Sequence, residues 1–578
     1  MVLCLLTLLD SGSYFAPYLI AGLAAFYCLL KNRTDGTDRK YRTPRSIIIV
    51  SFIAAVFITL ANHKIWLHPV MPDIRSAMFV RICKLLLVLI LMSGVYVIVL
   101  NILVFIRHDP EKIMFTPSEE SSKSKLFFFC IPFTAMLIIY MTIYLCCYYP
   151  GILSVDSIDQ IGQFFTGQYS NHHPFYHSVV IGLFLRAGLA VFGNINSAVA
   201  GFIIVQIIFM VTVFSFVIYN MAVLGLPRWV LVATSIWYCV MPFHFMYSFT
   251  LWKDVPFGAF VACLITFFIR IMTRKGNMRL NYIGFSVCGP FICLFRSNGM
   301  FAYVFVFLAL ILLARKQKKL LIITGMTILV CLILKYGVLK LFSVTPPDTV
   351  ESLSIPLQQV ARVIAEDGFI EDGDRALISQ IIDIDSAKES YDPTISDPIK
   401  NLIRDFGNQD HLSQNMSAYA GVYLRTLSHN PMTYVIAWVD STCGYWNSGY
   451  DYWVWYWDVQ ENPYGITRTI RSEGVLHAMD EYLWLYYNNT VLQLLTSIGL
   501  AVWILLILLA VSLFTGNRTA TLSTIPILAI ILSLLISSPV FSEFRYMYAL
   551  FCSLPMIMAI TLGSLETKNR EGSDEDNV

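Results

Sequence analysis

Long apolar segments separated by short polar loops make up most of this chain. A helix needs about 20 apolar residues to cross the hydrocarbon core of a bilayer, and about 13 segments reach or approach that length. They fall at about 13–30, 46–62, 85–106, 126–148, 198–222, 229–248, 255–272, 281–295, 300–314, 320–341, 488–515, 522–538 and 548–563. The pair at 281–314 is broken by a polar RSNG turn, so it is either a tight hairpin or a partly re-entrant element. The pattern predicts an all-α polytopic membrane protein with about 13 transmembrane helices.

The composition agrees with this pattern and excludes several other classes of protein. The chain is 57% hydrophobic and 13% charged, with a mean hydropathy of +0.65, which is not typical of a water-soluble domain. The net charge of +2 gives no sign of a nucleic-acid partner. Nearly all of the 13 cysteines fall inside apolar segments, so no disulfide framework or CxxC metal site is indicated. The N-terminus lacks a basic region and a small-residue cleavage site, so we expect the first apolar segment to remain as a helix.

Basic residues in the short loops set the expected orientation, because Lys and Arg stay on the cytoplasmic side. The basic loops at 31–45, 274–279 and 315–319 fall on one common side. This predicts a multi-pass plasma-membrane protein with a cytoplasmic C-terminus and with the loop 149–197 outside. The loop 63–84 is expected outside although it carries four basic residues.

One loop is much longer than the others and predicts a separate domain. Residues 342–487 contain no convincing span and hold more than half of the acidic residues of the chain. Apolar residues recur at helical spacing over 354–367 and 411–431, so we expect a mainly helical extracytoplasmic domain inserted before the last three helices. The expected organisation is an extra N-terminal transmembrane unit, a membrane core, this domain, a C-terminal group of helices and a disordered cytoplasmic tail, at 1–106, 126–341, 342–487, 488–563 and 564–578.

Titratable residues cluster near the helix ends that are expected to lie outside. They are Asp156, Asp159, His172, His173 and His177 in the first outer loop, Lys253 and Asp254, Arg296, and finally Glu543, Arg545 and Tyr546. Such groups are costly in hydrocarbon, so four segments with polar residues at this depth predict a shared aqueous cavity. Taken singly, each has a plainer interpretation: loop acids are usually solvated, interfacial Arg and Lys often extend to lipid phosphates, and histidines before a proline can cap a turn.

These residues also resemble a known group of membrane enzymes. An early acid in the first outer loop (Asp156 in YPGILSVDS), an amphipathic helix opened by HHPFYHS, a second outer acid (Asp254 in WKDVPF), the RSNG turn at 296–299, the basic RKQKK and the late EFRYMYAL are similar to the GT-C superfamily of glycosyltransferases. The likeness covers about 126–341 and 488–563, and it is nearest to an uncharacterised Gram-positive multi-spanning family. It implies transfer of a sugar from a polyprenyl-phosphate donor to an extracytoplasmic acceptor, either a cell-envelope glycopolymer or a glycolipid. It gives no role to 1–106.

Such a transfer needs a base for the acceptor hydroxyl and cations for the departing phosphate. We expect Asp156 to be the base, with inversion following from a single displacement. The expected lipid-phosphate ligands are Lys253, Arg296, Arg545 and Tyr546. The expected supporting acids and polar groups are Asp159, His172, His173, Asp254 and Glu543. Three cations leave little need for a cofactor, but a divalent cation is possible, since carboxylates and imidazoles are also metal ligands.

The stretch CGYWNSGYDYWVWYWD at 443–458 is the second notable motif. Aromatic faces suit the apolar face of a sugar, which makes Tyr450, Trp453, Trp455 and Trp457 candidate contacts for sugar or acceptor. An aromatic belt at the membrane surface explains the stretch equally well. A third interpretation is a lid that keeps water out of the cavity.

Two other classes of function compete with an enzyme. A transporter or flippase for a lipid-linked saccharide usually carries ionisable groups near the bilayer midplane, whereas here polar residues gather near one face. A non-catalytic scaffold for envelope assembly would not need Asp156. Neither the sugar nor the acceptor can be inferred from these residues.

Overall fold

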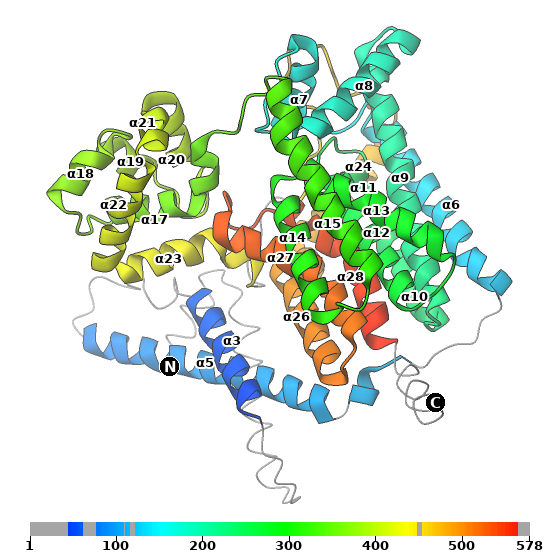
Figure 1. Ribbon diagram of the computed structural model, residues 1–578, viewed down its shortest axis with the longest axis horizontal. Helices are drawn as coiled ribbons and strands as arrows, with labels where there is room; N and C mark the ends of the chain where they lie inside the picture. The colour runs from blue at the N-terminus through cyan, green and yellow to red at the C-terminus, as the bar shows by residue number, and fades with distance from the viewer. Residues whose placement is uncertain (1–43, 62–76, 109, 116–121, 448–453, 564–578) are drawn as a thin grey trace, which may run out of the picture.

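The computed structural model describes residues 44–61, 77–108, 110–115, 122–447 and 454–563 (Figure 1). This part of the chain is helical, and its only strand-like features are isolated bridges. Nine of its helices are long and apolar enough to cross a membrane, or ten when the pair Arg228–Val240 and Pro242–Ser248, bent by 54°, counts as one span. The prediction of a multi-pass helical membrane protein is confirmed at this level, and the expected span at 13–30 lies outside the described residues.

The bounds of the membrane helices follow the apolar segments closely. The nine helices are α6 (Ser122–Cys147), α8 (Phe175–Phe192), α9 (Ile195–Val223), α12 (Asp254–Met272), α13 (Met278–Phe295), α15 (Lys318–Leu332) with its continuation to Leu341, α26 (Ile498–Thr515), α27 (Arg518–Ser537) and α28 (Phe544–Leu562). The bent pair is α10 (Arg228–Val240) and α11 (Pro242–Ser248), and shorter apolar helices are α3 (Arg45–Ala61), the second half of α5 (Ala77–His108) and α14 (Ser297–Leu313). The RSNG turn therefore joins two helices, α13 and α14, as a hairpin.

Helix α8 is among these nine, yet its contacts place it along one end of the bundle. The hydroxyl of Tyr176 donates to the carbonyl oxygen of Leu334 at 2.8 Å, near the end of the span that begins with α15. The ring centroid of His177 lies 5.3 Å from that of Phe295, the last residue of α13, and 6.3 Å from that of Phe202, in the first turns of α9. One helix that touches the ends of three others lies across them, and Figure 1 shows α8 and α7 (Val155–Thr166), the helix that carries Asp156, over that end of the bundle. We call this end the Asp156 face.

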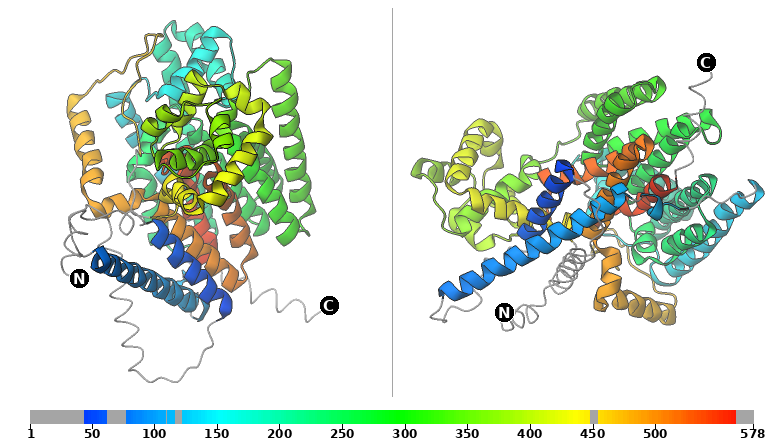
Figure 2. Two further views of the ribbon diagram at one scale, coloured as in Figure 1. Left: turned by 90° about the vertical axis from the view of Figure 1, so that its left-hand side faces the viewer. Right: turned by 90° about the horizontal axis from the view of Figure 1, so that it is seen from below.

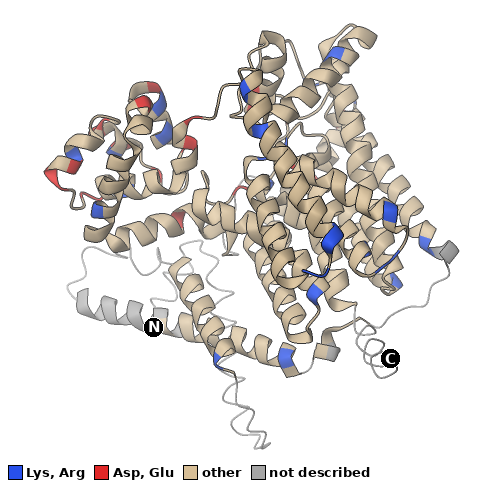
Figure 3. Ribbon diagram, in the orientation of Figure 1, with Lys and Arg blue, Asp and Glu red and all other residues tan. Residues whose placement is uncertain are grey.

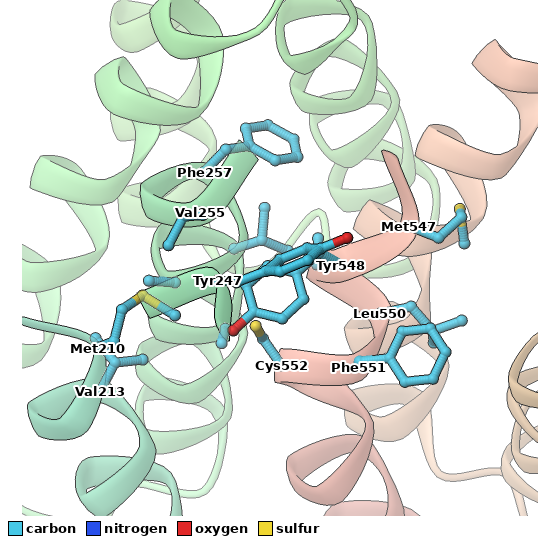
Figure 4. Packing of buried hydrophobic residues seen from close by; sticks show 14 of the residues in the cluster. Met210, Val213, Tyr247, Val255, Phe257, Met547, Tyr548, Leu550, Phe551 and Cys552 are labelled. Atoms are coloured by element: carbon cyan, nitrogen blue, oxygen red, sulfur yellow. The ribbon is translucent and has the colours of Figure 1, made fainter. Parts of the chain in front are cut away.

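The centre of the bundle is the packing of α12 against α28. Gly258 lets the two helices approach closely, because a Cβ atom at this position would meet the ring of Tyr548 at 3.1 Å. Tyr548 in turn packs against Tyr247 of α11 with ring centroids 4.6 Å apart. Figure 4 shows these side chains interlocking between the two groups of helices. Gly258 and Tyr548 are each four residues from the start of their helix, so this contact holds the start of α12 and the start of α28 side by side.

Six helices form a separate apolar core beside the bundle. They are α17 (Ser354–Ala365), α18 (Asp372–Ile378), α19 (Ile384–Ser390), α20 (Asp397–Asn401), α21 (Gln409–Gln414) and α22 (Met416–His429). Figures 1 and 2 show this unit to one side of the bundle, joined to it through α23 (Pro431–Thr442). Within the expected domain at 342–487, the buried apolar residues described after Trp438, including Val439, Tyr445 and Trp455, pack into the core of the bundle instead.

Four short loops at the end of the bundle opposite the Asp156 face carry basic residues and no acidic ones (Figure 3). The basic residues come from the loops that join α9 to α10, α12 to α13, α14 to α15 and α26 to α27: Arg228, Arg274, Lys275, Arg279, Arg315, Lys316, Lys318, Lys319 and Arg518. The positive-inside rule then predicts that this end is cytoplasmic and that the Asp156 face is outside.

This orientation can be tested by cysteine accessibility in a background in which the native cysteines are replaced. Ser379→Cys lies on an exposed position of the helical domain, and Lys316→Cys lies on the opposite end of the bundle. We expect a membrane-impermeant maleimide to label Ser379→Cys on intact cells, and to label Lys316→Cys only after the cells are opened. The reverse pattern would contradict the orientation.

Candidate functional site

Three extended segments meet side by side where α7 (Val155–Thr166) begins. The amide of Ile152 donates to the carbonyl of Phe249 at 2.8 Å, and the amide of Leu153 donates to the carbonyl of Asp458 at 3.3 Å. Parallel bridges join Ile152 to Thr250 and Leu153 to Val459. This backbone pairing joins three distant parts of the chain, and it brings the residues next to each segment, such as Asp156 and Lys253, close together.

Side chains then fix the first turn of α7. The hydroxyl of Ser157 accepts from the amide of Ser154 at 3.1 Å and donates to the carbonyl of Leu251 at 2.7 Å. The indole of Trp252 donates to the hydroxyl of Ser154 at 2.6 Å. Asp156 therefore stands in the first turn of a well-anchored helix, where the partial positive charge of the helix N-terminus favours a carboxylate.

Asp156 lies among three basic side chains. Its Oδ2 accepts a hydrogen bond from Nη1 of Arg545 at 2.8 Å, and the same oxygen lies 3.6 Å from Nζ of Lys253 and 4.0 Å from Nδ1 of His173. The side chain of Asp156 is 27% exposed, whereas those of Arg545 and Lys253 are 15% and 16% exposed. Carboxylate and cations thus share one partly open site.

The basic neighbours keep Asp156 ionised. Burial by itself would raise the pKa of Asp156, but Arg545, Lys253 and His173 outweigh burial and hold the pKa well below its ordinary value. Burial lowers the pKa of Lys253, and Asp156 and Asp254 oppose that change. The carboxylate is therefore charged at neutral pH, and Arg545 is its principal partner.

His173 joins Lys253 to the acids of α7. Its Nδ1 lies 3.1 Å from Nζ of Lys253, and its Nε2 lies 3.6 Å from Oδ2 of Asp159. Burial, together with Lys253, lowers the pKa of His173, while Asp159 and Asp156 oppose the change. A neutral imidazole that accepts from Lys253 at Nδ1 carries its proton on Nε2, toward Asp159. His172 packs edge-to-face on His173, with ring centroids 4.8 Å apart.

Arg296 belongs to an adjoining buried pair. Its guanidinium forms an ion pair with Asp254, whose side chain is fully buried. The guanidinium carbon also lies 4.7 Å from the ring centre of Tyr546, and the guanidinium carbon of Arg545 lies 5.3 Å from the same ring. Tyr546 therefore lies between the two arginines, and both cations gain from its ring electrons. Arg296 is connected to Asp156 through this ring and not by direct contact.

Glu543 completes the buried network. Its Oε1 lies 3.2 Å from Nε of Arg545, and its amide donates to the hydroxyl of Tyr445 at 3.2 Å. Burial raises the pKa of Glu543 to about 7, with Asp254 and Asp156 adding to the rise and Arg545 and Arg296 opposing it. Arg545 thus bridges a carboxylate that stays ionised and one that titrates near neutral pH.

The aromatic stretch reaches the site through a residue that the sequence analysis did not select. Tyr456 packs edge-to-face on Trp252 at 5.2 Å, and the Trp252 ring lies 5.3 Å from the guanidinium carbon of Arg545. Trp455 is buried against Tyr487 of α24 (Glu473–Asn488), while Trp457 is 47% exposed; Tyr450 and Trp453 lie outside the described residues. Successive side chains of an extended segment point to opposite sides, so Tyr456 faces the site while its neighbours Trp455 and Trp457, which were the candidates, do not share its direction. Trp252 could have been selected from the sequence, because it is the neighbour of the candidate residue Lys253.

The side chains at this site do not suit a divalent cation. Within the described part of the chain, no group of three or more His, Cys, Asp or Glu side chains is placed to hold a metal ion. The Lys253 ammonium lies between His173 and Asp156, where a metal bound by these two groups would have to lie. The positive charge at this position is therefore supplied by the protein.

Comparison with known proteins places the chain in a family without a described activity. A protein-family model matches residues 165–576. The chain belongs to the family of unknown function DUF6020. The DUF6020 match includes Lys253, Arg296 and Arg545, and it begins after Asp156. No curated protein and no solved structure matches the chain.

Glu543→Gln tests the buried network through protein stability. Folding raises the pKa of Glu543 from 4.5 to about 7, so the folded state binds this proton more tightly than the unfolded state does. The stability that the bound proton gives the folded state is complete below about pH 4.5 and is lost as the pH rises through about 7. We expect Glu543→Gln to raise the melting temperature above pH 7, with a gain of up to about 3 kcal/mol that disappears near pH 4.5.

The measurement is a series of thermal unfolding curves from pH 4.5 to 8.5 in detergent. Glu481→Gln is the matched control, because Glu481 is 72% exposed on α24. Parallel pH profiles for Glu543→Gln and the parent protein would contradict the assignment of the raised pKa to Glu543.

Proposed function

We propose that this protein is a membrane glycosyltransferase that moves a sugar from a polyprenyl-phosphate donor to an acceptor on the extracytoplasmic side. The observation that carries the proposal is the meeting of Asp156, Lys253 and Arg545 at one end of a helical membrane bundle. A partly exposed carboxylate and two adjacent cations are the groups that such a transfer needs. The acceptor is a cell-envelope glycopolymer or a glycolipid.

In the proposed reaction Asp156 accepts the proton of the acceptor hydroxyl. The acceptor oxygen forms a bond to the anomeric carbon while the bond from that carbon to the phosphate oxygen breaks, and the lipid phosphate leaves with the electron pair. A single displacement inverts the anomeric centre. No metal is required, because Lys253 and Arg545 balance the charge of the phosphate.

Arg545 links the two halves of this chemistry. In the free protein it holds the pKa of Asp156 low, and a carboxylate with so low a pKa is a weak base. A donor phosphate would compete with Asp156 for the Arg545 guanidinium, which would raise the pKa of Asp156 and make it a stronger base. Binding of the donor would thereby prepare the base.

The remaining residues have supporting roles in the proposal. Arg296 and Tyr546 would extend the cationic surface toward the donor phosphate, with Asp254 and Glu543 holding the two arginines in place. His173 would orient Lys253, and Asp159 would orient His173, while His172 packs behind them. Trp252 and Tyr456 offer aromatic faces next to Arg545.

The position of charge favours an enzyme over a transporter or flippase. In the described helices α9, α12, α13, α14, α26, α27 and α28, every charged residue falls within three residues of a helix end. The exceptions in the other spans are Arg186 in α8, which lies across the end of the bundle, and Lys335, which with Lys340 lies toward the outer end of the span Lys318–Leu341. A transporter usually places ionisable groups or broken helices near the bilayer midplane. A non-catalytic scaffold gives no reason for three basic side chains around one carboxylate.

Asp156→Asn tests the proposed base. We expect transfer to fall roughly 100-fold or more, because the amide cannot accept the proton, while the protein still folds and inserts. Mass spectrometry of envelope glycopolymers and glycolipids from cells with and without the gene would first name sugar and acceptor. Transfer in isolated membranes would then be measured for each variant.

Asp385→Asn is the matched control for Asp156→Asn, since Asp385 is an exposed acid in the first turn of a helix, α19, that belongs to the separate helical domain. It should retain most activity. Full activity of Asp156→Asn would remove Asp156 as the base, and an unchanged set of envelope glycans without the gene would argue against the enzyme.

Arg545→Lys tests the phosphate ligand. A lysine keeps the charge but cannot contact Asp156, Glu543 and a phosphate through one planar fork, so we expect the KM for the lipid donor to rise roughly tenfold or more. Arg270→Lys is the control, because Arg270 contacts Asn281 at the opposite end of the bundle. An unchanged donor KM in Arg545→Lys would exclude the proposed role.

A further inference from the structure

The helical domain beside the bundle contains an apolar cavity within its own core. Its volume is about 210 Å³, and it lies between α17, α19, α20 and α22. Aliphatic side chains from these helices and from the neighbouring turns line it, among them Leu357, Val360, Ala361, Ile381, Ile399 and Ile403. Protein interiors are normally packed with few voids larger than a water molecule, so a hollow of this size in a small domain is unusual.

The polar atoms around the cavity are bonded elsewhere. The hydroxyl of Tyr419 donates to the carbonyl of Leu377 at 3.0 Å, and the hydroxyl of Tyr423 donates to Oε1 of Gln359 at 2.7 Å. Water needs two or more polar partners to occupy a cavity, whereas a cavity of about 150 Å³ lined by aliphatic groups stays dry and binds apolar molecules such as benzene. The lining therefore suits a hydrocarbon group without hydrogen-bonding atoms.

The cavity can be reached from the domain surface. Two of its lining residues on α22, Met416 and Ala420, are exposed, and Leu353 and Pro356 opposite them are partly exposed. Leu424, one turn beyond Ala420, is 61% exposed. An apolar chain can therefore approach along an apolar surface before it enters.

We propose that this domain binds the end of a lipid hydrocarbon chain in the cavity. The domain is attached directly to a membrane helix, because the amide of Ser396 donates to the carbonyl of Pro539 at 2.8 Å and the indole of Trp438 donates to the carbonyl of Leu535 at 2.8 Å, both just at the end of α27. Acyl or isoprenoid chains are the abundant apolar groups at that position. The volume accommodates the end of such a chain and not its whole length.

Two short sets of hydrogen bonds connect the cavity to the candidate site around Asp156. Helix α17 lines the cavity with Leu357, and its next residue, Gln358, donates to the carbonyls of Asp392 at 2.7 Å and Ile395 at 3.0 Å. The loop held in this way bonds to 539–541, two residues before Glu543. A bound chain would therefore restrain the segment that leads into α28. The binding proposal itself does not rest on the proposed function.

The experiment uses the full-length protein in lipid nanodiscs with two photoreactive probes, a diazirine-bearing palmitate and a diazirine-bearing farnesol. Cross-linked peptides are mapped by mass spectrometry. We expect label on α17 and α22, and a fivefold or greater loss of that label in Ala420→Trp, whose indole would fill the opening. Label from the palmitate alone, from the farnesol alone or from both supports the proposal and identifies the chain.

Ala418→Trp is the matched control, because Ala418 is exposed on the same helix and does not line the cavity. Ala361→Leu, which fills the cavity from inside, should also lose label and should unfold at a higher temperature than the parent protein. Equal labelling of Ala420→Trp and Ala418→Trp, or label on α17 and α22 no stronger than on the exposed helix α18, would overturn the proposal.

Discussion

The ion pair between Arg545 and Asp156 is the contact on which the arrangement of the Asp156 face depends. The two residues are 389 positions apart in the chain, and their bond joins the first turn of α7 to the first turn of α28. Both side chains are partly buried, so each charge is stabilised by the other. Arg545 also holds Glu543 and lies over Trp252 and Tyr546, so one guanidinium organises side chains from three parts of the sequence.

Much of the membrane architecture could be predicted from the sequence, because hydrocarbon tolerates few alternatives to apolar helices. Two departures from simple spans differ in how much the sequence indicated. Phe175–Phe192 has the composition of a span, yet the HHPFYHS motif indicated an amphipathic helix within the outer loop 149–197, and contacts such as Tyr176 with Leu334 place it across the ends of other helices. The bend between α10 and α11 has a local cause in Pro242, which cannot continue a helical hydrogen-bond ladder.

The polar residues near the Asp156 face could be selected from the sequence, because charge near a membrane helix end is costly enough to be informative. Their pairing could not. Arg296 was expected beside Asp156 but is neutralised by Asp254, and the two arginines are related through the ring of Tyr546. The pKa of Glu543, about 7, also depends on burial and on four charged neighbours together, so it has no signature in the sequence. Tyr456 was overlooked because the direction of a side chain in an extended segment depends on pairing with distant backbone.

The three extended segments at the start of α7 are held together mainly by backbone amides and carbonyls of Ile152, Leu153, Phe249 and Asp458. Such bonds are nearly indifferent to which side chain each residue carries, but they depend strictly on register. Homologous chains can therefore change many of these side chains without moving the carboxylate, whereas gain or loss of a single residue in any segment would shift it by about 3.3 Å and turn it to the other side. Divergence in this region is thus expected as substitution and not as change in length.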